Sequence, residues 1–177
     1  MNQTGLQQLK NSRVLATVAL LIAMDLVLNA FRLRISPTVE INFAFLAVLI
    51  NAYLFGPAVA GLSAVLGDII GFIITPSGMF FPGFTLNALV IALIFSYGLY
   101  QQKSISWSRL ISVFLAKSVV ISLILTPLWL KILYGTELFA VPRIIRTLIL
   151  FPIEVGLAML VLKVVDRVMA NKSFQYR

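Results

Sequence analysis

The sequence contains no cysteine and no histidine among its 177 residues. These absences exclude disulfides, thiol nucleophiles and imidazole bases, and they remove the commonest ligands of transition metals. Charge is also scarce, since 11% of the residues are charged, whereas about a quarter are charged in a typical soluble domain. We therefore expect no metal site and no cofactor, in a chain that is not surrounded by water on all sides.

Apolar residues make up 60% of the sequence, and the mean hydropathy is +1.02. A helix that crosses a bilayer needs about 20 mostly apolar residues. Six segments approach this length: 14–31, 41–55, 57–74, 82–100, 110–130 and 143–165. The sequence thus predicts an all-α integral membrane protein with six transmembrane helices, in which residues 1–177 form a single membrane domain.

Lysine and arginine are most numerous at the helix ends that share a side with the N-terminus. Because cytoplasmic helix ends carry an excess of these residues, both termini are expected in the cytoplasm, with residues 1–13 and 166–177 as cytoplasmic segments. Five cations remain on the extracellular side: Arg32, Arg34, Lys131, Arg143 and Arg146. The net charge of +8 is spread over helix ends without a basic run interleaved with aromatics, so the pattern does not favour nucleic acid.

A break with the sequence TPSGMFFPG interrupts the apolar stretch 67–94. Proline fixes φ and lacks an amide hydrogen, and glycine allows positive φ, so a helix should end near Thr75. A loop this apolar is expected to fold back at membrane depth, where irregular backbone must be buried in protein or line a cavity. We expect it to form one wall of a ligand site, with irregular extracellular loops capping the pocket.

Two arginines, Arg143 and Arg146, follow Pro142 at the start of the sixth segment. Residues three apart share a helix face, and a helix N-terminus already carries positive potential, so the pair favours an anionic ligand. Lys131 lies just across the same loop. The alternative is that both arginines reach lipid phosphates.

Aromatic residues are frequent in the same extracellular regions. Phe80, Phe81 and Phe84 come at the end of the break, and Trp129 and Tyr134 bracket Lys131. Rings at helix ends often form interfacial belts, but rings on two loops of one face can also sandwich a flat ring system. Glu40, in the first extracellular loop, is either a solvated carboxylate or an acceptor for a ligand's amino and ring N–H groups.

Four ionisable residues fall within the predicted spans: Asp25, Asp68, Lys117 and Glu154. Such groups are costly in lipid and usually face the interior of the bundle. Asp68 and Lys117 both lie near mid-depth, which permits an internal ion pair between them. A proton or sodium relay is the alternative.

Ala16, Ala19 and Ala23 lie on a face of the first segment roughly opposite Asp25, because an advance of two residues rotates a helix by about 200°. Small residues one turn apart let another helix approach closely. With Asp25 turned inward, this face points out of the bundle and favours contact with a partner protein.

Five segments carry a family resemblance: PTVEINFAFLAVLI, LFGPAVAGLSAVLGDIIGF, TPSGMFFPGFTL, LWLKILYG and PRIIRTLILFPIEV. In these segments the chain resembles the folate-specific substrate-binding (S) components of energy-coupling factor (ECF) transporters. The resemblance implies a multi-pass protein of a prokaryotic plasma membrane that binds folate from outside, reorients in the bilayer and is not an enzyme. It also implies a transmembrane scaffold subunit, met through Ala19 and Ala23, and two cytoplasmic ATPases. The sequence has no GxxxxGK[ST] phosphate loop of its own.

Folate combines a flat pterin, a benzoyl linker and a glutamate tail with two carboxylates. The expected substrate-binding residues are cationic, aromatic or hydrogen-bonding groups: Glu40, Phe84, Asn87, Trp129, Lys131, Tyr134, Arg143 and Arg146. The cations suit the tail or the linker carbonyl, the rings suit stacking, and Glu40 or Asn87 suits the pterin edge. The chain departs from the family at Glu40, where a basic residue is common, and at Thr126 and Pro127, where an Asn-Thr pair is common.

Other functions stay open at this point. The chain could be an S component for another vitamin, or a secondary transporter driven by an ion gradient through Asp25, Asp68 and Glu154. Many secondary transporters are built from paired repeats, and this sequence shows no convincing internal repeat. An intramembrane enzyme would need an aspartyl pair, and Asp25 and Asp68 have no matching motif around them.

Overall fold

The computed structural model describes residues 5–31, 33–36, 39–76, 79–102, 105–135 and 141–170, with side chains except at 33–36, 39–41, 134, 141–144 and 170. The first half contains η1 (Gly5–Lys10), α1 (Ser12–Ala30), β1 (Leu33–Ser36), β2 (Val39–Ile41), α2 (Phe45–Phe55) and α3 (Pro57–Ile74). The second half contains α4 (Pro82–Leu99), α5 (Trp107–Lys117), the π-helix η2 (Ser118–Leu125), α6 (Thr126–Tyr134) and α7 (Val141–Ala170).

Within the described ranges, five helical stretches are long and apolar enough to cross a membrane: Ser12–Ala30, Pro57–Ile74, Pro82–Leu99, Trp107–Leu133 and Ile145–Met169. A shorter apolar helix, α2, has 11 residues. These lengths and compositions fit an integral membrane protein. The second predicted span is shortened because its first residues belong to β2 and α2 begins only at Phe45.

The sequence predicted an irregular first extracellular loop. In the structure this segment contains a short antiparallel strand pair, β1 and β2. Leu33 lies opposite Ile41 and Arg34 lies opposite Glu40, with a bulge between Arg34 and Ser36. Strands of this length carry too few residues for an alternating pattern to show in the sequence. The pair contacts the start of the last helix through β2.

The break between α3 and α4 begins where the sequence predicted. The amide and hydroxyl of Thr75 both donate to the Gly71 carbonyl, at 2.9 and 3.0 Å, and α4 starts with Pro82 at its first position, where proline is favoured. The prediction that this loop is buried in protein holds only at its end. Met79 is 77% exposed and Phe80 is also exposed, whereas Gly83 is buried. The Phe80 ring packs back on Phe72 of α3, with ring centroids 5.1 Å apart.

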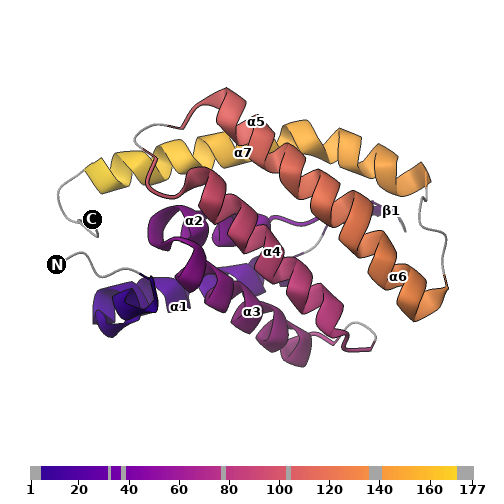
Figure 1. Ribbon diagram of the computed structural model, residues 1–177, viewed down its shortest axis with the longest axis horizontal. Helices are drawn as coiled ribbons and strands as arrows, with labels where there is room; N and C mark the ends of the chain where they lie inside the picture. Colours follow the sequence, from indigo (N-terminus) through magenta and orange to yellow (C-terminus); the bar gives the residue numbers. More distant parts are fainter. Residues whose placement is uncertain are drawn as a thin grey trace.

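The helices lie along one another as a bundle with two distinct ends (Figure 1). The start of α1 and the C-terminal end of α7 lie at one end. The other, called the hairpin end here, carries β1, β2, the start of α4, α6 and the start of α7. The elements that hold the candidate ligand-binding residues therefore lie at the same end of the molecule.

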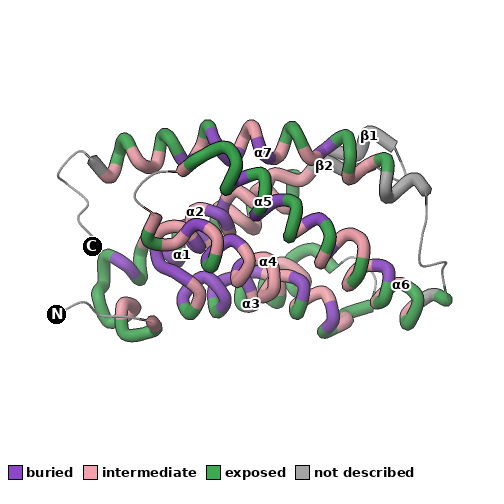
Figure 2. The backbone as a smooth tube through the Cα atoms, turned by 45° about the horizontal axis from the view of Figure 1, so that its top comes forward, coloured by how far each residue is buried: buried purple, intermediate pink, exposed green. Residues whose placement is uncertain are grey.

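Buried residues concentrate where α2, α3, α4 and α5 meet, whereas exposed positions follow the outer sides of the helices (Figure 2). Leu49, Phe95, Phe114 and Leu162 are fully buried in this core. Many exposed residues are large and apolar, such as Leu148 at 70% exposure. An apolar outer surface of this extent marks contact with lipid.

The sequence permitted an ion pair between Asp68 and Lys117, but in the structure these two residues have other partners. Lys117 Nζ lies 2.6 Å from Glu154 Oε2, and Asp68 Oδ2 accepts a hydrogen bond from Thr85 at 2.7 Å. The reason is the packing order, because α5 lies against α7 and α3 lies against α4. Asp25 approaches Gly67 so closely that a Cβ there would meet its carboxylate at 3.0 Å.

Candidate functional site

A hydrogen-bonded group joins the start of α4 to α6 at the hairpin end. Trp129 Nε1 donates to Asn87 Oδ1 at 3.0 Å, and Asn87 Nδ2 donates to Thr126 Oγ1 at 3.3 Å. Asn87 is only 7% exposed, and a buried amide of this kind needs partners at both ends. Asn87 therefore fixes the orientation of the Trp129 ring.

Three aromatic rings gather around this group. The Phe81 ring lies 6.0 Å from Phe84 and 5.7 Å from Trp129, both in tilted or edge-on arrangements. A Cβ at Gly83 would fall 2.3 Å from the Phe81 ring and 2.7 Å from the Trp129 ring, so only glycine fits under them. The structure thus brings together Phe84, Asn87 and Trp129 of the expected substrate-binding residues and adds Phe81, another ring of the same aromatic group after the break.

A cavity of about 60 Å³ lies beside Arg146, between α7 and the segment that leads into α2. Its lining comes from these two elements: Asn42, Phe43, Phe45, Arg146, Leu150, Ile153, Glu154 and Leu157. The α7 residues follow steps of three and four, so they form one face of the helix. Phe84 and Trp129 are not among the lining residues, so Arg146 belongs to a different part of the hairpin end.

The cavity has a cationic and an anionic end. Arg146 and Glu154 lie eight positions apart on α7, which corresponds to about 12 Å along a helix axis. Glu154 bonds Lys117 through Oε2, and Lys117 Nζ lies 5.5 and 5.6 Å from the ring centroids of Phe45 and Phe114. Sequence reasoning noted Glu154 and Lys117 as buried charges but did not place them beside Arg146.

The wall opposite α7 is anchored to α1 by an asparagine that sequence reasoning missed. Asn42 Nδ2 donates to Asn29 Oδ1 at 2.7 Å, and the Ala44 amide donates to Asn42 Oδ1 at 2.8 Å. A side chain that accepts from a nearby backbone amide is common just before a helix. Asn42 thereby holds the non-helical segment 42–44 against the bundle.

The remaining predicted residues divide into two groups. Lys131 is exposed on α6. Glu40, Tyr134 and Arg143 occupy β2, the end of α6 and the start of α7, and their side chains lie outside the described residues. Their roles in ligand binding stay predictions.

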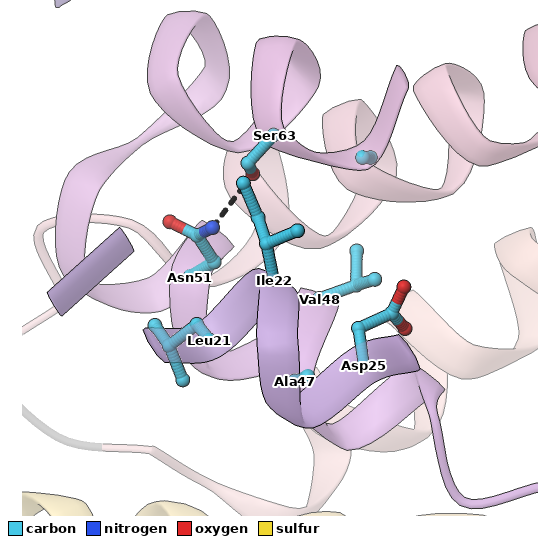
Figure 3. A pocket seen from close by; sticks show the side chains of 8 residues that line it. Leu21, Ile22, Asp25, Ala47, Val48, Asn51 and Ser63 are labelled. Atoms are coloured by element: carbon cyan, nitrogen blue, oxygen red, sulfur yellow. Dashed lines mark hydrogen bonds between the residues drawn. The ribbon is translucent and has the colours of Figure 1, made fainter. Parts of the chain in front are cut away.

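A second, much smaller cavity of about 10 Å³ lies between α1, α2 and α3 and is lined in part by Asp25, Asn51 and Ser63 (Figure 3). Asn51 Nδ2 donates to Ser63 Oγ at 2.6 Å, and Asn51 Oδ1 is buried without a hydrogen-bond partner among the described residues. A volume of this size is about that of one water. It is too small for a vitamin.

The alanine face of α1 is turned away from this cavity. Ala16, Ala19 and Ala23 are exposed, as is Leu20 between them, whereas Asp25 lines the inner cavity. The orientation of α1 expected from the sequence is therefore the one that the structure has.

Apolar spans, ionisable groups paired inside the bundle and a polar cavity near one end define an α-helical integral membrane protein. The family model described as "ECF transporter, substrate-specific component" matches residues 13–165. The chain belongs to this family, as the resemblance in its sequence indicated.

Relatives and a solved structure extend the comparison. The chain is 32% identical over 161 residues to the folate transporter FolT of Clostridium novyi, covering 90% of this chain and 93% of that protein. It is 35% identical over 157 residues to FolT of Leuconostoc mesenteroides, covering 84% of this chain and 83% of that protein. A crystal structure of FolT bound with folic acid matches with a TM-score of 0.77 and 35% identity, covering 84% of this chain and 92% of that one.

Proposed function

We propose that this chain is the folate-binding, substrate-specific subunit of an ECF-type vitamin importer and has no enzymatic activity of its own. The observation that carries the proposal is the likeness to FolT bound with folic acid, at 35% identity and a TM-score of 0.77. The relatives matched over most of the chain carry the name folate transporter. Transporter components of this family act by binding, and partner subunits supply the energy.

The chemistry of the hairpin end supports an acidic vitamin with flat rings. Arg146 supplies a guanidinium that can bind a carboxylate with two parallel hydrogen bonds, and we propose Arg143 and Lys131 as further cations for the same tail. Phe84 and Trp129 supply ring faces for stacking, with Tyr134 as a further proposed ring. Asn87 acts by holding Trp129, since both ends of its amide are engaged, and Glu40 remains a proposed hydrogen-bond acceptor.

We further propose six membrane crossings with both termini in the cytoplasm. The helix α2 alone is about 16 Å long. Ala44 before it is already helical, with φ −58° and ψ −29°, and with residues 41–43 added the segment can reach about 28 Å, close to the roughly 30 Å of the hydrocarbon core. Non-helical backbone at membrane depth is tolerated where it lines a cavity, and Asn42 and Phe43 line one. This supports the proposal that the segment completes a sixth crossing in the cell membrane.

The proposed partners are a transmembrane scaffold subunit and two cytoplasmic ATPases, as the family implies. The exposed alanines Ala19 and Ala23 form the proposed scaffold contact, because small residues allow close helix approach. A subunit that reorients in the bilayer must keep an apolar outer surface on its other faces, and the exposed leucines and isoleucines supply one.

The test is a titration of the purified chain in detergent with folate, thiamin, riboflavin and pantothenate, read by tryptophan fluorescence. Trp129 lies in the ring cluster, whereas Trp107 is 53% exposed at the start of α5, away from the hairpin end. We expect quenching by folate only, retained in Trp107→Phe and lost in Trp129→Phe. Saturable binding of another vitamin in place of folate would contradict the proposal.

A further inference from the structure

We propose that Glu154 contacts the ligand, accepting hydrogen bonds from the amino and ring N–H edge of the pterin, and that Lys117 is the positioning residue behind it. This assignment rests on the proposed folate function and adds a specific reader of the heterocycle. The sequence predicted Glu40 or Asn87 for that edge, and the amide of Asn87 is already engaged by Trp129 and Thr126.

Glu154 is placed where a ligand can reach it. It lines the same cavity as Arg146, yet its side chain is only 21% exposed. A carboxylate inside a membrane span is costly, and such residues mark substrate pathways by default. Lys117 engages Oε2, and Oε1 carries no hydrogen bond in the part of the chain that the structure describes. One oxygen of an ionised acceptor is therefore left for donors in the cavity.

Lys117 supports this carboxylate from outside the cavity. It is 13% exposed, is not among the lining residues, and its Nζ lies beside the rings of both Phe45 and Phe114. The Lys117 ammonium and the Glu154 carboxylate form an ion pair across 2.6 Å, and a charged acceptor makes hydrogen bonds about twice as strong as a neutral one. Lys117 also immediately precedes the π-helix η2, a rare conformation that is frequent at functional sites.

Stability alone is a poor explanation for the pair. Replacing a buried ion pair by apolar residues of similar volume is often neutral or stabilising, because desolvation offsets the attraction. A position within an apolar bundle would then be better filled by leucine or methionine. The Lys117–Glu154 pair places a carboxylate in the wall of the cavity, and this position supports a role in ligand binding.

The polarity of the cavity also sets a direction for the ligand. Arg146 and Glu154 share one face of α7 about 12 Å apart, so an anionic tail fits near Arg146 and a donor-rich ring edge fits near Glu154. The opposite orientation would place carboxylates against Glu154, and like charges at short range repel strongly in a low-dielectric site. A cavity of about 60 Å³ has room for a ring edge or a few waters, so the rest of the vitamin extends beyond it.

The test compares two ligands on two proteins. The ligands are folic acid and an analogue whose 2-amino group is replaced by methyl, and the proteins are the wild-type chain and Glu154→Gln, titrated in detergent. We expect Glu154→Gln to weaken folic acid by about 10- to 100-fold, the range for a hydrogen bond to a charged group. The wild-type chain should lose a similar factor for the analogue, and the two losses should not add, because both remove one contact.

Asp166→Asn is the matched control, since Asp166 is another partly buried carboxylate on α7, bonded to Tyr53 at 2.5 Å far from the cavity. It should leave both affinities unchanged. Lys117→Met should weaken folic acid more than it weakens the analogue. A purely structural role would instead lower both affinities by one common factor.

Four outcomes overturn the assignment. Glu154→Gln with wild-type affinity, or with equal losses for both ligands, removes Glu154 from the pterin edge while leaving the folate function intact. If Glu154→Gln does not fold, equal affinity of the wild-type chain for folic acid and the analogue has the same consequence. A wild-type chain that binds no folic acid ends the proposed function and this assignment together.

Discussion

The indole N–H of Trp129 on α6 donates to the side-chain oxygen of Asn87 on α4 across 3.0 Å. This bond joins two helices that are separated in the chain by α5 and the π-helix. Because the Asn87 amide also donates to Thr126, the Trp129 ring has one preferred orientation before any ligand arrives. A ring fixed in advance loses less conformational freedom on stacking with a ligand.

Asn87→Leu should therefore weaken folate binding through Trp129. The substitution leaves the indole N–H without its acceptor, which costs about 1–3 kcal/mol for a buried donor. Fluorescence cannot report on variants that lack Trp129, so affinity is measured by calorimetry. In a Trp129→Phe background, Asn87→Leu should have little further effect on affinity. Additive losses in that double variant would show that Asn87 acts on the ligand by another route.

Gly83→Ala should disturb the same rings by a different cause. The new Cβ would lie 2.3 Å from Phe81 and 2.7 Å from Trp129, so both rings must move, at a cost of about 1–3 kcal/mol for overpacking. Gly156→Ala is the matched control, because a Cβ at that α7 position has open space around it and should be neutral or slightly stabilising. Thermal unfolding in detergent and folate titration measure both. Equal behaviour of the two variants would contradict the packing argument.

The sequence predicted the long apolar helices well and the contacts between them poorly. Proline and glycine mark the end of α3 near Thr75 and the start of α4 at Pro82, because their effects are local to the backbone. Lys117 and Glu154 lie 37 positions apart, and their pairing depends on which helices pack together. Hydrophobic runs do not specify which helices are neighbours in the bundle. The sequence therefore also permitted Asp68 as the partner of Lys117.

The candidate site shows the same division. Phe84, Trp129 and Arg146 were selected by residue type and position near helix ends, and the structure places them at one end of the bundle. Phe81 packs against Trp129, and Asn42 donates a hydrogen bond to Asn29. These contacts join different parts of the chain, so no local sequence pattern predicts them. The loop after α3 was predicted to be buried because it is apolar, yet apolar residues of a membrane protein can equally face lipid.

Lys117→Met should destabilise the protein by about 3 kcal/mol or more, because it leaves the partly buried carboxylate of Glu154 without its ion-pair partner. The double variant Lys117→Met with Glu154→Leu should recover most of this stability, since no charge is then left unpaired. Unfolding transitions of the single and double variants in the same detergent form the measurement. A double variant that is no more stable than Lys117→Met would show that the unpaired Glu154 is not the cause of the lost stability.

Arg146→Gln should weaken the binding of folate by about 1–3 kcal/mol, the value of a charge-assisted hydrogen bond. It should leave unchanged the affinity for a pterin fragment that lacks the glutamate tail. Lys163→Gln is the matched loss of positive charge, because Lys163 is exposed on the same helix far from the cavity. It should leave the affinity for folate unchanged. An equal loss in both variants would point to a general effect of net charge rather than to contact with the tail.

Ala19→Trp should separate binding from transport. Ala19 is exposed on the outer face of α1, and Asp25, which lines the inner cavity, faces away from it, so the indole should not disturb the ligand site. Folate affinity of the purified chain should stay within about two-fold of wild type, whereas uptake by cells that also make the scaffold and ATPases should be lost, because a large side chain prevents close helix approach. Leu160→Trp, at a lipid-facing position on α7, controls for bulk and should transport normally. Normal uptake by Ala19→Trp would place the scaffold contact on another face of the protein.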